Sequence, residues 1–107
     1  MDVSGPQYDL KLIYGIVRKG NIVLERNADR DSKNICFFED EVAKCLCRIS
    51  PSDYYKSKTY PLENGKDIVF DIYKLECENS QQVFNELYIK LRVSSGNWVY
   101  IGSFKLK

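Results

Sequence analysis

The sequence contains no histidine, so any proton transfer that it catalyses must use tyrosine, lysine, arginine, aspartate or glutamate. Catalysis by Ser-His-Asp, Cys-His or paired histidines is therefore excluded. Two segments combine phenols with cations: Tyr54-Tyr55-Lys56-Ser57-Lys58, and the alternating Tyr88, Lys90 and Arg92. Rings that stack on bases and cations that meet phosphates are typical of proteins that bind single-stranded RNA. Such residues also occur on solvated strands with no ligand, so both interpretations stay open at this point.

Neither the four cysteines nor the carboxylates predict a metal site. One residue separates Cys45 from Cys47, whereas zinc sites use two close cysteine pairs or added histidines. Asp67 and Asp71 are separated and flank an apolar strand. We therefore expect no metal and no other cofactor, and we expect all the cysteines to be reduced thiols that pack as small apolar side chains.

Length and composition indicate one folded domain over residues 1–107. The chain is 44% hydrophobic and 29% charged, which excludes a disordered protein. Its net charge of +1 is too small to attract a polyanion as a whole, so RNA would have to meet a local basic patch. Residues 1–6 show no signal-peptide pattern, and no apolar run approaches the roughly 20 residues of a bilayer span. We expect a cytoplasmic protein without a membrane partner.

The first half of the chain predicts helices. Residues 8–19 place apolar side chains at helical spacing, and Gly20 ends that helix. Residues 22–24 predict a short strand or extended arm. The polar residues 27–34 predict a short helix that Asn27 or Asp31 would cap.

A further helix is predicted over residues 39–48. Its acidic first turn and its final Arg48 both suit the helix dipole. Pro51 ends it, because the residue before a proline is disfavoured in the helical region. The apolar stripe of this helix consists of Val42, Cys45, Leu46 and Ile49.

From Pro51 onward the hydrophobic period changes to two, which predicts strands. A turn over residues 63–66 and a four-residue hairpin loop over residues 94–97 separate some of them. Helices followed by strands predict an α+β fold, with the helices packed on one face of an antiparallel sheet. The predicted strands are residues 53–60, 67–76, 86–93 and 98–106.

The last two strands predict an apolar face and a basic face, because side chains alternate along each strand. We pair Val93 with Trp98 across the loop, which puts Lys105 one pair diagonally from Tyr88. The apolar face then carries Leu87, Ile89, Leu91, Val93, Trp98, Tyr100 and Phe104. The basic face carries Tyr88, Lys90, Arg92, Val99, Ile101, Ser103 and Lys105.

Several segments resemble the MqsR family of toxins in order and spacing. The clearest is Ser50-x-Ser52-Asp53-Tyr54-Tyr55-Lys56-Ser57, which matches the family's Ser-x-Ser-Asp-(aromatic)-Tyr-Lys-Ser run after a helix. Asp71-Ile72-Tyr73, the alternating segment from Tyr88 to Val93, and Ser103-Phe104-Lys105-x-Lys107 continue the match. The resemblance implies a RelE-like fold, which agrees with the α+β order read from the pattern.

The resemblance also implies a type II toxin–antitoxin system, in which an endoribonuclease cleaves mRNA and a cognate antitoxin inhibits it. Carried over by position, the family's catalytic residues fall on Lys56, Tyr88 and Lys105. A functional glutamine of the family falls on Phe70, which cannot hydrogen-bond a phosphate or a base edge but could stack on a base. The residues that we expect to bind RNA around the catalytic ones are Tyr55, Lys58, Lys90 and Arg92.

The chemistry expected of such a site is metal-independent attack of a ribose 2′-hydroxyl on the adjacent phosphate, which releases a 5′-hydroxyl fragment. Cations would stabilise the phosphorane, and Tyr88 would orient the 2′-hydroxyl or transfer its proton. Clustered cations favour a phenolate, so we expect the pKa of Tyr88 to be lowered. The alternative is a non-catalytic RNA- or protein-binding module, such as a degenerate toxin or an immunity- or antitoxin-like protein.

Overall fold

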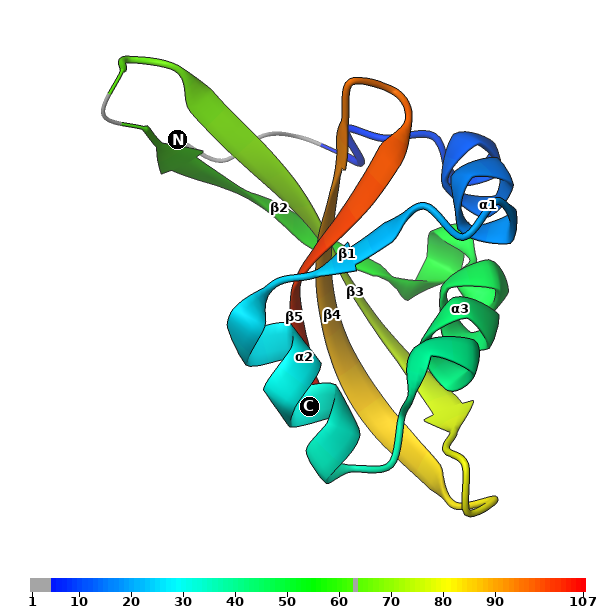
Figure 1. Ribbon diagram of the computed structural model, residues 1–107. Coiled ribbons are helices and arrows are strands. Elements are labelled where there is room, and N and C mark those ends of the chain that lie inside the picture. The colour runs from blue at the N-terminus through cyan, green and yellow to red at the C-terminus, as the bar shows by residue number, and fades with distance from the viewer. Residues whose placement is uncertain (1–4, 63) are drawn as a thin grey trace.

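The computed structural model describes residues 5–62 and 64–107. Within them the chain forms three α-helices, one 3-10 turn and five strands, which confirms the α+β class (Figure 1). Two predictions fall partly outside the described residues. Residues 1–4 belong to the segment in which we found no signal-peptide pattern, and Glu63 belongs to the predicted turn. The elements are α1 (Leu10–Arg18), β1 (Ile22–Leu24), α2 (Arg26–Asn34), α3 (Glu39–Arg48), η1 (Pro51–Asp53), β2 (Tyr54–Pro61), β3 (Asp67–Glu78), β4 (Phe84–Ser94) and β5 (Trp98–Leu106).

The strands form one sheet in the order β1-β5-β4-β3-β2. Strand β1 runs parallel to β5, and the other neighbours are antiparallel. The helices pack against one face of this twisted sheet, with α1 beside α3 and α2 beside β1 and β5 (Figure 1). Among the described helices, none is long and apolar enough to cross a membrane. The sheet side chains in the core are Tyr73, Cys77, Leu87, Ile89, Leu91, Val99, Ile101 and Phe104.

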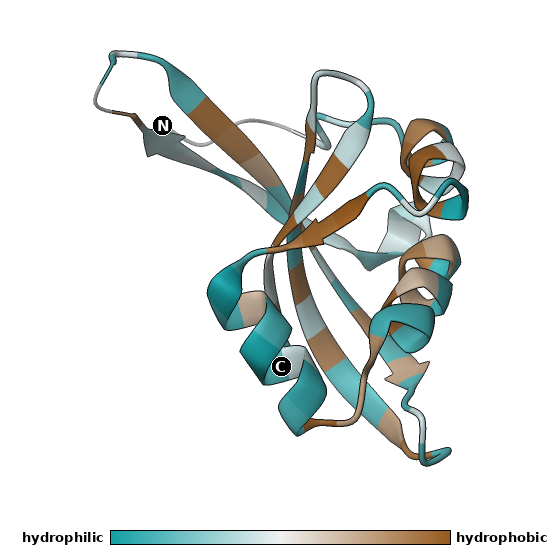
Figure 2. Ribbon diagram, viewed as in Figure 1, coloured by the Kyte–Doolittle hydropathy of each residue, from teal (hydrophilic) through white to brown (hydrophobic). Residues whose placement is uncertain are grey.

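The helices confirm the predicted pattern, with one correction to a cap. Helix α3 has the predicted bounds, and α1 begins at Leu10 after Asp9, whose side chain accepts from the N–H of Lys11. Helix α2 is almost wholly hydrophilic (Figure 2), and it follows Glu25, not Asn27 or Asp31. The N–H of Glu25 bonds to the carbonyl of Ile101, so the β1–β5 ladder leads directly into the helix without a side-chain cap.

The predicted hairpin register is wrong by one residue next to the loop that joins β4 and β5. Ser94 pairs with Trp98, and Val93 pairs with Val99, across a loop in which Ser95 and Gly96 have positive φ. This puts Val99 and Ile101 in the core, and it puts Trp98 and Tyr100 on the opposite face.

A bulge then changes the register of β5 beside Gly102. Leu91 pairs with Ile101 but Lys90 pairs with Ser103, so residues beyond the bulge return to the faces that the sequence predicted. Phe104 is buried in the core, and Lys105 lies directly opposite Tyr88. The predicted diagonal proximity of Lys105 and Tyr88 is therefore a direct cross-strand pair.

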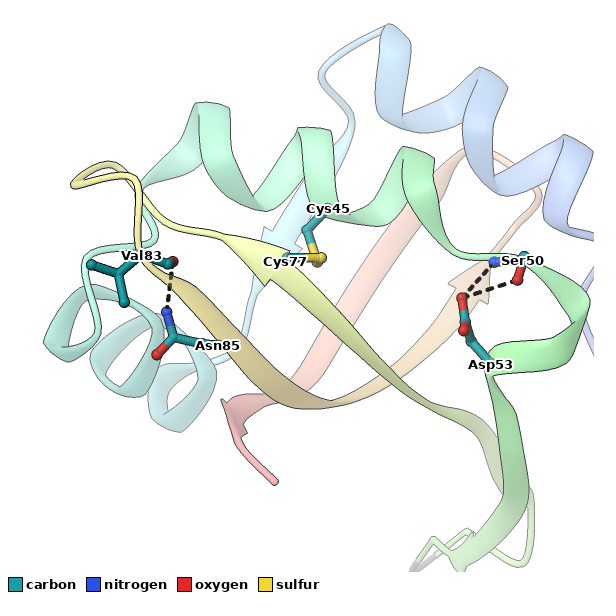
Figure 3. Close-up of a disulfide and its surroundings, with 6 residues drawn as sticks. All are labelled: Cys45, Ser50, Asp53, Cys77, Val83 and Asn85. Atoms are coloured by element: carbon teal, nitrogen blue, oxygen red, sulfur yellow. Dashed lines mark hydrogen bonds between the residues drawn. A yellow bond between two sulfur atoms is a disulfide. The ribbon is translucent and has the colours of Figure 1, made fainter.

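The expectation of four reduced thiols is wrong for one pair. Cys45 of α3 and Cys77 of β3 are buried and form a disulfide, with their Cα atoms 5.8 Å apart (Figure 3). Sequence alone could not choose among the possible pairings of four cysteines. Among the described residues, Cys36 and Cys47 are free and partly buried. The disulfide fixes α3 to the covered face of the sheet.

The corrected register predicts opposite costs for two neighbouring substitutions. Val99 is 0% exposed and Trp98 is 42% exposed. Val99→Asp should lower the free energy of unfolding by about 3 kcal/mol or more, because it buries a carboxylate without a partner. Trp98→Asp should cost about 1 kcal/mol, since that side chain already meets solvent. Urea denaturation measures both, and a larger loss for Trp98→Asp would contradict the register.

Candidate active site

The segment Ser50–Asp53 turns the chain from α3 into β2. The N–H and hydroxyl of Ser50 donate to the Asp53 carboxylate at 2.8 and 3.1 Å (Figure 3). The Ser50 hydroxyl also lies 2.9 Å from that of Ser52. These motif residues therefore shape the turn that brings Tyr55 and Lys56 onto the sheet.

Asp71 of β3 is a buried carboxylate that holds the N-terminal segment and β2 in place. It is 0% exposed and accepts hydrogen bonds from the N–H groups of Gln7 and Tyr8 at 2.8 to 3.0 Å. The hydroxyl of Ser57 donates to it at 2.6 Å and lies 2.7 Å from the hydroxyl of Tyr54. Asp71 thus joins the N-terminal segment, β2 and β3 on the face opposite the cations.

The other face of the sheet, which no described helix covers, carries most of the predicted site residues. We call it the open face. The strand registers place on it Lys56, Lys58 and Tyr60 of β2, Phe70, Ile72 and Lys74 of β3, Tyr88, Lys90 and Arg92 of β4, and Tyr100, Ser103 and Lys105 of β5. Glu76 and Glu86 lie opposite one another on the same face, beyond Lys74 and Tyr88, and Glu86 lies 3.9 Å from the Lys107 ammonium. The other ion pairs within the described residues involve Arg30 and Lys33 of α2. The lysines and the arginine of the open face listed above therefore form no ion pair within the described residues, although the chain is nearly neutral overall.

Tyr88 lies between two lysines. Lys74 is directly opposite it on β3, and Lys105 is directly opposite it on β5. The Lys105 ammonium lies 5.3 Å from the centre of the Tyr88 ring, within the range of a cation–π interaction. The sequence predicted Tyr88 and Lys105 as neighbours, but it did not identify Lys74.

Lys56 lies near Tyr88 and its two lysines only by way of Tyr55, whose ring contacts both Lys56 and Lys74 at a bulge near the start of β2. The Lys74 ammonium lies 3.6 Å from the centre of the Tyr55 ring, and the Lys56 ammonium lies 5.3 Å from it. Lys56 and Tyr55 are exposed. Lys56 is therefore not a cross-strand neighbour of Tyr88, and one strand separates the two.

Phe70 supports cations and is not free to stack on a base. Only 4% of it is exposed, so the stacking role that the sequence allowed is wrong. The Lys90 ammonium and the Arg92 guanidinium lie 5.1 and 5.9 Å from the centre of its ring. Arg92 also lies 4.4 Å from the centre of the Tyr100 ring. The Phe70 ring thus lies close to two residues that the sequence predicted to bind RNA.

Tyr60 is a member of the open face that the sequence pattern did not single out. Lys90 donates a hydrogen bond of 2.9 Å to its hydroxyl, and the Lys58 ammonium lies 5.2 Å from the centre of its ring. Its ring meets the edge of Phe70 at 5.5 Å between centroids. Only the alternation of Lys58 and Tyr60 on one strand face could have indicated this residue, since Lys90 comes from a distant strand.

The two phenols have opposite pKa shifts. Burial raises the pKa of Tyr88, as do the nearby hydroxyls of Tyr60 and Tyr55, while Lys58 lowers it less. The expectation of a lowered pKa for Tyr88 is therefore wrong. Burial alone would raise the pKa of Tyr60, but the hydrogen bonds and charges of Lys90 and Lys58 outweigh it and lower the pKa. At neutral pH, Tyr88 is a hydrogen-bond donor.

The amino-acid sequence that forms this sheet matches a known protein family. Residues 5–106 match the family model described as "Motility quorum-sensing regulator, toxin of MqsA". The chain therefore belongs to the MqsR toxin family and is a toxin of the toxin–antitoxin class. No curated protein matches the chain. Within the described residues, no three His, Cys, Asp or Glu side chains lie together as a metal site requires.

The Asp71 network predicts a large stability loss on truncation. Asp71→Ala removes the acceptor of the Gln7 and Tyr8 N–H groups and of the Ser57 hydroxyl, so it should lower the free energy of unfolding by about 3 kcal/mol. Asp67→Ala, on the same strand but exposed, is the matched control and should cost at most about 0.5 kcal/mol. Guanidinium denaturation compares them, and a wild-type midpoint for Asp71→Ala would rule out the anchoring role.

Proposed function

We propose that this toxin is an endoribonuclease that cleaves mRNA on the open face of its sheet. The observation that supports this most is Tyr88 between Lys74 and Lys105, directly opposite both. A phenol flanked by two cations can donate to a phosphate oxygen while the ammonium groups offset its charge. Lys56, Lys58, Lys90 and Arg92 extend the positive surface along which the RNA backbone would bind.

The proposed reaction is attack of the ribose 2′-hydroxyl on the adjacent phosphate, without a metal. Negative charge grows on the non-bridging oxygens as the phosphorane forms, and Lys74, Lys105 and Lys56 would stabilise it. Tyr88 is protonated at neutral pH, and its raised pKa keeps it so at higher pH; it would donate to the phosphate or to the leaving 5′-oxygen. The products would be a 2′,3′-cyclic phosphate and a 5′-hydroxyl.

A cognate antitoxin is the second proposed partner, because the family is described as toxins of MqsA. The alternative that the chain binds RNA without cleaving it draws on the same cations and rings, and cleavage assays separate the two. Toxin family membership supports this alternative only as a degenerate toxin, not as an immunity- or antitoxin-like protein.

Purified protein should cut a defined single-stranded RNA in the presence of EDTA. Tyr88→Phe should slow cleavage by about 10²–10⁴-fold, the usual contribution of one positioned acid–base group. Lys105→Ala and Lys56→Ala should also slow it, because they remove charge beside the phosphorane. Lys44→Ala, an exposed lysine of α3 on the covered side, should cleave at the wild-type rate. Gel analysis of end-labelled RNA reports each rate.

Intact RNA in the wild-type lane, with filter binding that weakens in salt, would instead support the binding alternative. Equal losses in Lys44→Ala and Lys105→Ala would show that the open face has no special role. Cleavage that requires added divalent metal would contradict the proposed reaction.

Expression in growing bacteria should arrest growth if the chain is a toxic RNase. Tyr88→Phe should abolish the arrest while accumulating to the same level, because the isosteric ring preserves the fold. Co-expression of an antitoxin of the family's partner class that binds the chain should restore growth. Growth curves with immunoblots measure this, and arrest by Tyr88→Phe at equal abundance would argue against catalysis as the cause.

A further inference from the structure

Tyr60 has the environment of a stabilised phenolate. It is half-buried on the open face, where Lys90 of β4 donates to its hydroxyl at 2.9 Å. Lys58 of its own strand lies over its ring at 5.2 Å, and Lys90 lies over the same ring at 4.6 Å. The two ammonium groups therefore stabilise the ionised form of this phenol and lower its pKa.

Tyr60 influences Tyr88 across the open face. The charge of Tyr60 is one cause of the raised pKa of Tyr88, after burial. Lys58 acts on both of them, and Lys90 acts on Tyr60. Titratable groups whose environments separate their pKa values in this way are suited to act as base and acid in one reaction.

The proposed cleavage needs a base, and the chain offers few candidates. It has no histidine. Among the carboxylates, Asp71 already accepts several hydrogen bonds on the opposite face. Glu76 and Glu86 share the face of Tyr88, but both are exposed to solvent. Tyr60 accepts one hydrogen bond from Lys90, which leaves its oxygen able to accept another from a substrate hydroxyl.

We propose that Tyr60 is the general base of the cleavage reaction and that Tyr88 is its general acid. This inference rests on the proposed endoribonuclease function. The Tyr60 phenolate takes the proton of the 2′-hydroxyl as the 2′-oxygen forms its bond to phosphorus. The bond from phosphorus to the 5′-oxygen breaks, and the leaving oxygen takes the Tyr88 proton. Proton exchange with solvent then restores the Tyr60 phenolate and the neutral Tyr88.

The assignment fixes the sign of the pH dependence. The base must be deprotonated, so the rate should rise about tenfold per pH unit below the pKa of Tyr60. That rise should level off below the ordinary tyrosine pKa of about 10, because Lys90 and Lys58 outweigh the effect of burial on Tyr60. The acid must be protonated, and the raised pKa of Tyr88 delays the alkaline fall.

The test is a pH–rate profile of RNA cleavage by wild type, Tyr60→Phe and Tyr14→Phe, with the rate without enzyme subtracted. Tyr60→Phe should lose about 10²–10⁴-fold in rate and show a flattened rise with pH. Tyr14→Phe, whose hydroxyl bonds to the Ile49 carbonyl on the helical side, should keep the wild-type profile. Thermal unfolding confirms that each variant is folded.

A tyrosinate titration followed by ultraviolet absorbance gives a readout independent of activity. Wild type and Tyr14→Phe should show one phenol that ionises below the others, and Tyr60→Phe should lack that step. Lys90→Met keeps the aliphatic stem but removes the ammonium, so it should move the step to higher pH.

The outcomes separate this inference from the function on which it rests. Wild type that cleaves RNA, with Tyr60→Phe unchanged in rate and profile, would overturn the role of Tyr60 and leave the endoribonuclease standing. Wild type that cleaves no RNA at any pH would overturn both. Loss of rate in Tyr60→Phe with an unchanged pH profile would show that Tyr60 positions the substrate and is not the base.

Discussion

The helices cover one face of the sheet, and this one-sided burial decides where the charges lie. Because side chains alternate along a strand, the residues between the core positions must point away from the helices. A lysine placed on the covered face would lose several kcal/mol of hydration, so the cations gather on the open face. The same alternation that places Leu87 and Ile89 in the core therefore places Tyr88 beside Lys74 and Lys105.

Aromatic rings then hold cations that have no carboxylate partners among the described residues. Tyr60, Phe70 and Tyr100 lie beneath Lys90 and Arg92 at 4.4 to 5.9 Å, and each such contact contributes on the order of 0.5–2 kcal/mol. The rings fix the ammonium and guanidinium groups without neutralising them. A polyanion on the open face would relieve their mutual repulsion, so the proposed RNA binding does not require a large net charge.

The bulge beside Gly102 affects both the position of Lys90 over the aromatic rings and the register that places Lys105. A Cβ atom at Gly102 would lie 3.0 Å from the Lys90 side chain and 3.0 Å from the Phe70 ring. The missing side chain therefore leaves room for Lys90 to cross Phe70 and reach Tyr60. Beyond the bulge, the shifted register buries Phe104 and brings Lys105 opposite Tyr88.

The sequence predicted the elements, and some of the residues that share the open face, because those features depend on local patterns. Helix α3 has an acidic start, an apolar stripe and a terminating proline, and each is local. The faces of Trp98 and Val99 were predicted wrongly because the hairpin loop has three residues and not four. A change of one residue in loop length moves every side chain of the next strand to the other face, and the sequence pattern does not distinguish the two lengths.

Features that depend on residues distant in sequence could not be predicted from the local sequence pattern. Lys74 joins the site only because β3 pairs with β4, and the pKa of Tyr60 is lowered partly by Lys90, which is 30 residues away. The disulfide of Cys45 and Cys77 likewise depends on α3 crossing β3. The resemblance identified Lys56, Tyr88 and Lys105 together, but it could not show that Lys56 approaches through Tyr55 and Lys74.

The most direct test is a crystal structure with a short RNA that carries one 2′-deoxynucleotide at its cleavage site. That substitution removes the attacking hydroxyl and preserves the phosphate, so the complex should be stable. The account predicts that this phosphate lies on the open face, within hydrogen-bond distance of Tyr88 and Lys105. RNA bound on the helical side of the sheet, or a phosphate distant from both residues, would contradict it.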